Sequence, residues 1–134
     1  MNYDHRRIEQ LGHAKLILEN TIHGLAHLIG TYSFRTVDEV LNIIKYTDDI
    51  LKTLLFLLDW HEEGPVHIRE RPAQLIMQLI STKVSQTIEN FAPLDRATRL
   101  TALIEIKYDL KTVKTIIQAA ADIMQSEWRL TQLN

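Results

Sequence analysis

The stretch LIEIKYDLKTVKTIIQAAADIM, residues 103–124, decides the fold of this 134-residue chain. Its apolar residues recur at alternating steps of three and four, the spacing that places side chains on one face of an α-helix. Asp95 stands just before this pattern and is a suitable N-cap. We therefore predict one long helix over residues 96–131, about 50 Å in length at 1.5 Å per residue. Its expected core line is Leu103, Ile106, Leu110, Val113, Ile117, Ala120 and Met124.

Three more segments with helical periodicity precede this helix. The breaks between segments are short and carry turn-forming residues at Gly30–Thr36, Glu63–Pro65 and Ala92–Asp95. Four amphipathic helices with short connections are typical of an up-down-up-down bundle. We therefore expect an all-α four-helix bundle forming one domain over residues 1–134, with a long C-terminal helix. The three earlier helices are predicted over residues 4–29, 37–61 and 72–91.

Two of these helix starts carry recognisable signals. Thr36 followed by Glu39 matches a capping box, in which each side chain bonds the backbone N–H of the other residue. Pro72 suits a first helical turn, where its missing N–H has no partner to lose. The apolar line expected along the third helix is Ile76, Leu79, Ile80, Val84, Ile88 and Phe91.

The composition excludes several classes of function. The chain has no cysteine, which excludes disulfide scaffolds, thiol catalysis and cysteine-based metal sites. Its formal net charge is −2, so we expect no general nucleic-acid binding. The apolar runs are far shorter than the roughly 20 residues that span a bilayer, so we expect no membrane segment. Together with the polar start of the chain, these features favour a cytoplasmic protein.

The sequence carries more apolar residues than one core stripe per helix requires. The stretch Ile50–Trp60 is apolar nearly all round near its end, and a second line offset from the core follows the last helix. Such surplus surface on a monomer typically marks association. We therefore predict an interface with a second copy or another protein. The alternative is that these residues cover the ends of the bundle. The predicted contact residues are Leu55, Phe56 and Trp60, together with Ile116, Ile123 and Leu130.

Charges on the last helix are sorted to the two sides of its core line. The basic side holds Arg96, Lys107, Lys111 and Lys114, and the acidic side holds Glu105, Asp109 and Glu127. Such sorting is typical of charges that select neighbouring helices, although a solvated face has the same appearance.

Six histidines raise the question of a metal or phosphoryl site. Glu19, His23 and His27 recur at steps of four, so they share one face of a helix and could chelate a divalent ion. An exposed imidazole could also accept a phosphoryl group. Because this face points away from the apolar stripe, whereas bundle metal sites point inward, we treat a histidine-dependent module as the second hypothesis.

No catalytic motif accompanies these residues. Gly-rich phosphate loops, the Gly-x-Ser-x-Gly elbow and His-Glu-x-x-His are absent from the sequence. The acidic pair Asp48–Asp49 has lysines four residues away and is interpreted as surface ion pairs. Gly12 and Gly24, inside the first helix, are expected to allow close packing. The sequence thus favours a non-enzymatic protein–protein interaction module without a cofactor.

Overall fold

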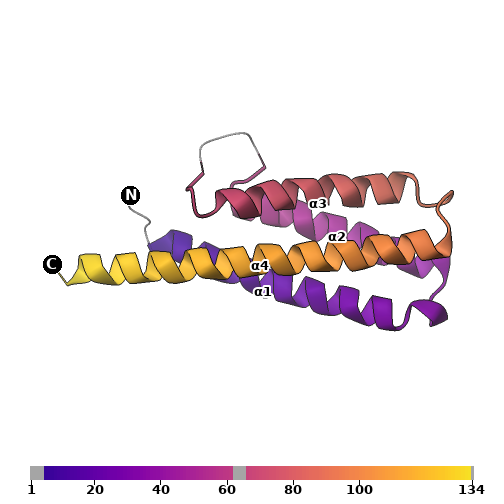
Figure 1. Cartoon of the computed structure of the whole chain (residues 1–134), viewed down its shortest axis with the longest axis horizontal. Helices are drawn as coiled ribbons and strands as arrows, with labels where there is room; N and C mark the ends of the chain where they lie inside the picture. Colours follow the sequence, from indigo (N-terminus) through magenta and orange to yellow (C-terminus); the bar gives the residue numbers. More distant parts are fainter. Residues whose placement is uncertain (1–4, 62–65, 134) are drawn as a thin grey trace.

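The computed structural model describes residues 5–61 and 66–133, and within them every regular element is helical. The elements are α1 (His5–Gly30), the short 3-10 helix η1 (Tyr32–Phe34), α2 (Val37–Leu57), α3 (Arg71–Glu89) and α4 (Arg96–Gln132). The four α-helices lie side by side in one bundle, and α4 is the longest (Figure 1). The predicted all-α four-helix bundle with a long C-terminal helix is confirmed.

Side-chain caps begin α2 and α4 at the residues that the sequence predicts. The Glu39 backbone N–H donates to Thr36 Oγ1 over 3.1 Å, and the Thr36 N–H donates to Glu39 Oε2 over 3.3 Å. At α4, Asp95 Oδ1 accepts from the Thr98 N–H over 2.7 Å, and this bond lowers the pKa of the Asp95 carboxyl. Each cap satisfies an amide that the first helical turn leaves without an intrahelical partner.

Helix α2 ends at Leu57, four residues before the predicted end at 61. Asp59 adopts a left-handed conformation with φ of 58°, which a helix cannot continue through. The Trp60 N–H donates to Leu55 O over 2.7 Å and the Asp59 N–H donates to Phe56 O over 3.1 Å. These two bonds form a Schellman motif, which reverses the chain and aims Trp60 back at the bundle.

Neighbouring helices run antiparallel. Glu19, in the second half of α1, pairs with Lys114 at the middle of α4. His5, at the start of α1, contacts the ring of Trp128 near the C-terminal end of α4. The acidic side of α4 instead meets α3, through Glu105 with Lys83 and Glu127 with Arg69. The sorted charges of α4 thus lie against two different helices. The pairs α1–α4 and α3–α4 pack most extensively, and α1–α2 least.

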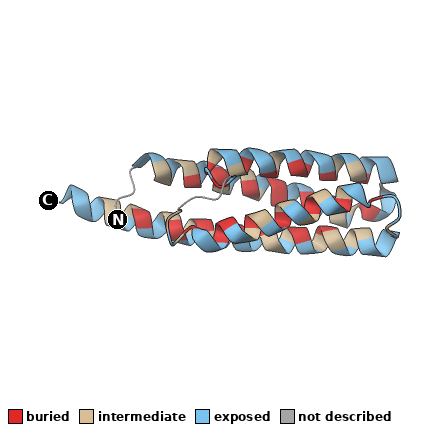
Figure 2. Cartoon of the chain, turned by 90° about the horizontal axis from the view of Figure 1, so that it is seen from above, coloured by how far each residue is buried: buried red, intermediate tan, exposed pale blue. Residues whose placement is uncertain are grey.

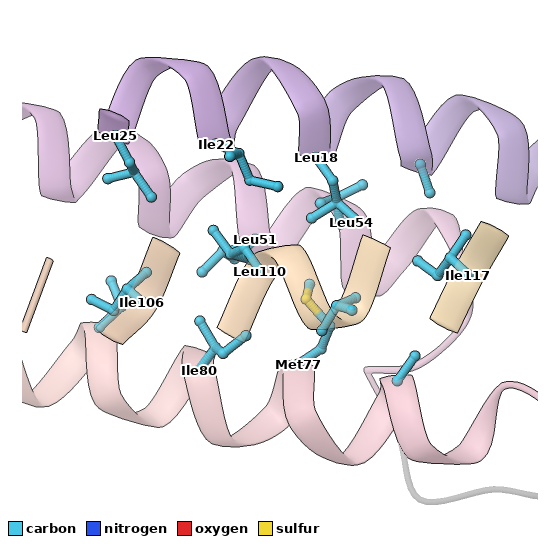
Figure 3. Packing of buried hydrophobic residues seen from close by; sticks show 14 of the residues in the cluster. Leu18, Ile22, Leu25, Leu51, Leu54, Met77, Ile80, Ile106, Leu110 and Ile117 are labelled. Carbon is cyan, nitrogen blue, oxygen red and sulfur yellow. The ribbon is translucent and has the colours of Figure 1, made fainter. Parts of the chain in front are cut away.

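One hydrophobic core fills the centre of the bundle. Figure 2 shows buried residues along the inner side of each helix, and Figure 3 shows their side chains converging from all four helices. All seven residues of the predicted α4 line are buried. The side chains labelled in Figure 3 are Leu18, Ile22, Leu25, Leu51, Leu54, Met77, Ile80, Ile106, Leu110 and Ile117.

The predicted core line of α3 is wrong at one position. Leu79 is 72% exposed, and Met77, outside the predicted line, is fully buried. Five of the six residues from 75 to 80 are apolar, so the sequence pattern does not define which side of this helix faces inward. The structure selects the line through Ala73, Met77, Ile80 and Val84 and turns Leu79 outward.

A buried polar network closes the end of the bundle where α2 stops. The Arg7 guanidinium pairs with Glu70 and also donates to Leu58 O over 2.8 Å. The Trp60 indole N–H donates to Glu70 Oε1 over 3.1 Å. Glu70 is 2% exposed, so these bonds replace the water that its carboxylate loses on burial. The network ties α1, the end of α2 and the start of α3 together.

Within residues 5–61 and 66–133, no helix is both long and apolar enough to cross a membrane.

Candidate functional site

The structure separates the six predicted contact residues into exposed and buried groups. Phe56 is 68% exposed, and Ile123 and Leu130 are exposed on α4. Leu55 and Ile116 are half-buried and pack partly against the core. Trp60 is fully buried.

Trp60 is therefore wrong as a predicted surface contact. The left-handed turn at Asp59 directs its side chain inward, and its N–H bonds the buried Glu70 carboxylate. The prediction assumed that the helix continued to residue 61, which would have placed Trp60 on the same outer side as Phe56. A change of backbone direction at one residue reverses that placement.

The line Ile116, Ile123 and Leu130 lies on the α3 side of α4. Two contacts fix the relative positions of these helices, with Lys83 beside Glu105 and Arg69 beside Glu127. Residues 69 and 83 are 14 positions apart and residues 105 and 127 are 22 positions apart, so these contacts place Ile116 within a few residues of the level of Ile76. Figure 3 shows Met77 of α3 between Leu110 and Ile117 of α4 along the bundle, which agrees with this register. Ile76 and Ile116 both pack partly against the core.

Exposed leucines on α3 extend this line across a second helix. Leu75 is 44% exposed and Leu79 is 72% exposed, and the register places them level with the segment around Ile116. From Pro72 to Thr82, α3 carries no charged residue. We use the name α3–α4 face for the surface formed by Leu75 and Leu79 of α3 with Thr112, Ile116, Ala119 and Ile123 of α4.

Ion pairs bound this uncharged surface at both ends. Lys83 with Glu105 lies beyond one end, and Arg69 with Glu127, at 2.8 Å, lies beyond the other. An apolar centre with polar groups at its margins is the arrangement found at protein–protein interfaces. Leu79 was missed because an apolar residue in an amphipathic pattern is assigned to the core first, and Leu75 belongs to neither the predicted core line nor the predicted contact residues.

The end of α4 extends past the neighbouring helices (Figure 1). α4 still contacts α1 at Trp128, because the ring centroids of Trp128 and His5 are 4.9 Å apart. The following residues, 129–133, are all exposed, and they include Leu130 at 63% and Leu133 at 81%. Leu130 continues the line of Ile116 and Ile123 at the same spacing, so the apolar surface extends onto this end.

The remaining predicted residues lie elsewhere on the bundle. Leu55 and Phe56 belong to α2, which packs between α1 and α3 and lies diagonally opposite α4. Phe56 stacks on His61 with 4.2 Å between ring centroids. The two groups of residues that the sequence predicts as one interface are therefore on different sides of the molecule.

No family model, curated protein or solved structure matches this chain.

The histidine hypothesis rests on the outer face of α1. His23 and His27 are exposed there, and Glu19 lies 3.8 Å from both Lys15 and Lys114. Those two lysines compete with a cation for the Glu19 carboxylate. Among the described residues, no three histidine or acidic side chains come together in a way that could hold a metal ion.

The acidic pair on α2 is partly as predicted. Asp48 Oδ2 lies 2.8 Å from Lys52 Nζ, one turn later, and the hydrogen bond to Asp48 raises the pKa of Lys52. Asp48 itself is buried, at 7% exposed, so the pair is not a fully solvated one.

A groove of about 380 Å³ lies between α1 and α2, where neighbouring helices pack least closely. A Cβ added at Gly24, on its lining, would meet nothing within 4 Å, and the same holds at Gly12. The expectation that these glycines allow close packing is therefore wrong. All lining residues are uncharged: Ile17, Asn20, Thr21, Gly24, Leu25, Ile43, Tyr46, Thr47 and Ile50.

Proposed function

We propose that this chain is a non-enzymatic protein–protein interaction module of the cytoplasm, and that the α3–α4 face is its contact surface. The observation that carries the proposal is the exposure of Leu79 and its neighbours on a surface without charge, bounded by an ion pair at each end. We further propose that the first partner is the chain itself.

Burial of this surface supplies the driving force. A leucine or isoleucine side chain gains about 1.5–3 kcal/mol when it passes from full exposure to full burial. Leu75, Leu79, Ile123 and Leu130 each retain a large part of that exposure in the isolated chain. No charged group lies among Leu75, Leu79 and Ile123. Between Ile123 and Leu130, the charges of Glu127 and Arg69 are paired with each other, so burial of this surface leaves neither charge without a partner.

The outer face of α1 is the reference surface within the same molecule. It presents Glu9, His13, His23 and His27 to solvent, with a single exposed leucine, Leu16, among them. An isolated apolar residue on a polar face is normal for a soluble helix. The α3–α4 face thus exposes more apolar side chains than the outer face of α1 does.

Charge substitutions test this proposal directly. We expect Leu79→Glu combined with Ile123→Glu to abolish self-association, since two carboxylates would be placed in an apolar contact. Sedimentation velocity at high micromolar concentration should then give a mass near 15.6 kDa, against twice that value for the natural chain. Far-UV circular dichroism should show unchanged helicity, because both side chains are exposed at present.

Leu16→Glu is the matched control, because Leu16 is 60% exposed on α1. This variant should associate like the natural chain. If the double variant retains the mass of the natural chain, the α3–α4 face is not the contact surface. Loss of helicity in the double variant would show that these residues belong to the core, which also contradicts the proposal.

A further inference from the structure

We infer that two copies pair antiparallel about a two-fold axis at Ile123, so that the end of each α4 lies on the α3–α4 face of the other. This inference rests on the proposed function, because it specifies the partner and its orientation at the same surface.

The spacing of the α4 line is the first observation. Ile116 precedes Ile123 by seven residues and Leu130 follows it by seven. A line with equal steps on both sides of its centre matches a copy of itself turned by two-fold symmetry. In such an isologous contact each residue i meets j of the copy, and j meets i of the copy. An antiparallel pair centred on Ile123 therefore places Leu130 against Ile116 twice.

The overhanging end of α4 is the second observation. Residues 129–133 extend beyond the contact between His5 and Trp128, and Leu130 and Leu133 are 63% and 81% exposed. In the antiparallel pair, Leu133 of one copy is ten residues from the axis and lies level with residue 113 of the other. Both leucines then rest on the bundle of the second copy.

The exposed leucines of α3 lie at the matching levels. Because Ile76 lies near the level of Ile116, Leu75 lies near the level of residue 117 and Leu79 near that of residue 113. Leu130 of the second copy thus arrives beside Leu75, and Leu133 of the second copy arrives beside Leu79. The two exposed leucines at the end of α4 in one copy thus contact the two exposed leucines of α3 in the other copy.

Charge and area agree with this pairing. The α3–α4 face itself is uncharged, and the charges of Arg69 and Glu127, which lie between Ile123 and Leu130, are paired with each other within each copy. From Thr112 to Leu133 the surface is about 30 Å long. It is about 20 Å wide where α3 and α4 lie side by side and about 10 Å wide along the overhanging end of α4. Roughly 450 Å² per copy, or about 900 Å² in total, is smaller than a standard interface, which predicts a weak dimer that dissociates on dilution.

Single cysteines test the orientation, because the natural chain contains none. Ile123→Cys should form an intermolecular disulfide rapidly under mild oxidation, since the two Cα atoms face each other across the axis. A mixture of Leu130→Cys and Leu75→Cys proteins should give mainly the mixed disulfide. Leu16→Cys, exposed on α1, is the control and should crosslink at least tenfold more slowly.

A second pair of variants guards against damage at Ile123. Ala119→Cys and Ser126→Cys are both exposed and lie on opposite sides of the axis, so their mixture should also give the mixed disulfide. A parallel dimer would instead favour 119–119, 126–126 and 130–130 disulfides, and would overturn the inference. If the chain is dimeric by mass but Ile123→Cys and both mixtures fail to crosslink, the orientation is wrong and the proposed function stands. A monomeric natural chain would contradict both.

Discussion

The two apolar surpluses of this chain, the end of α2 and the outer line of α4, have opposite outcomes. At the end of α2, the turn at Asp59 sends Trp60 into the core, where its indole bonds Glu70. On α4, the helix is uninterrupted from Arg96 to Gln132, so Ile123 and Leu130 keep the outward direction that their position on the helix gives them. The exposure of a surplus apolar residue can thus be predicted more reliably inside a regular helix than at the end of a helix.

The largest effect is expected at Trp60. We expect Trp60→Ala to lower the free energy of unfolding by about 3–5 kcal/mol, because it empties a fully buried site and removes a donor to Glu70. Urea unfolding monitored by circular dichroism measures this loss. Phe56→Ala, four residues earlier and exposed, should change stability by less than about 0.5 kcal/mol. Equal losses would show that the two positions do not differ as described.

The end of α4 should show the opposite behaviour. Leu130→Ala with Leu133→Ala should leave the stability of the dilute chain within about 0.5 kcal/mol, because both side chains are exposed. The same variant should raise the dissociation constant of the dimer about tenfold or more, equivalent to at least ~1.4 kcal/mol of lost contact. Urea unfolding of the dilute chain measures the stability, and sedimentation across a dilution series measures the dissociation constant. An unchanged dissociation constant would remove the α4 end from the interface.

The turn that separates the two regions is tested by glycine. Asp59→Gly should raise the free energy of unfolding by about 0.5–1 kcal/mol, since glycine adopts the left-handed conformation without the clash of a Cβ. Asp49→Gly, at an exposed position inside α2, should lower it by about 0.3 kcal/mol, because glycine is less favourable than aspartate inside a helix. If both substitutions destabilise the chain, the residue after α2 is not left-handed.

The smallest effect concerns pH. Burial lowers the pKa of His67, Glu70 raises it and Arg69 lowers it, and the net shift is downward. Because the pKa of His67 is lower in the folded chain, the folded chain binds fewer protons than the unfolded chain as the pH falls below the ordinary imidazole pKa of 6.5. The contribution of His67 to the free energy of unfolding therefore falls as the pH drops below 6.5 and does not change well above it. His67→Gln should reduce this slope between about pH 7 and pH 5 in urea titrations. A slope that is unchanged in the variant would contradict this assignment.

Much of the fold was predictable because its signals are local. The capping box at Thr36, the N-cap at Asp95 and the core line of α4 each depend on residues close together in sequence. The direction of the chain after Leu58 was not predictable, because aspartate is neither required nor excluded at a left-handed position.

The candidate site was only half predictable for a related reason. The outer line of α4 follows from periodicity, because α4 has a clear core line to compare it with. Leu79 was assigned to the core, because α3 is apolar on adjacent sides and its rotation is set by packing with α2 and α4. The core contacts of α3 and its ion pair between Lys83 and Glu105 both depend on helices far apart in sequence.

The most direct test of the central claim, that the α3–α4 face is buried between copies, is the solution mass of the natural chain. Light scattering over a hundredfold range of concentration should give about twice 15.6 kDa at the upper end and fall toward 15.6 kDa on dilution. A mass of 15.6 kDa at every concentration would contradict the claim.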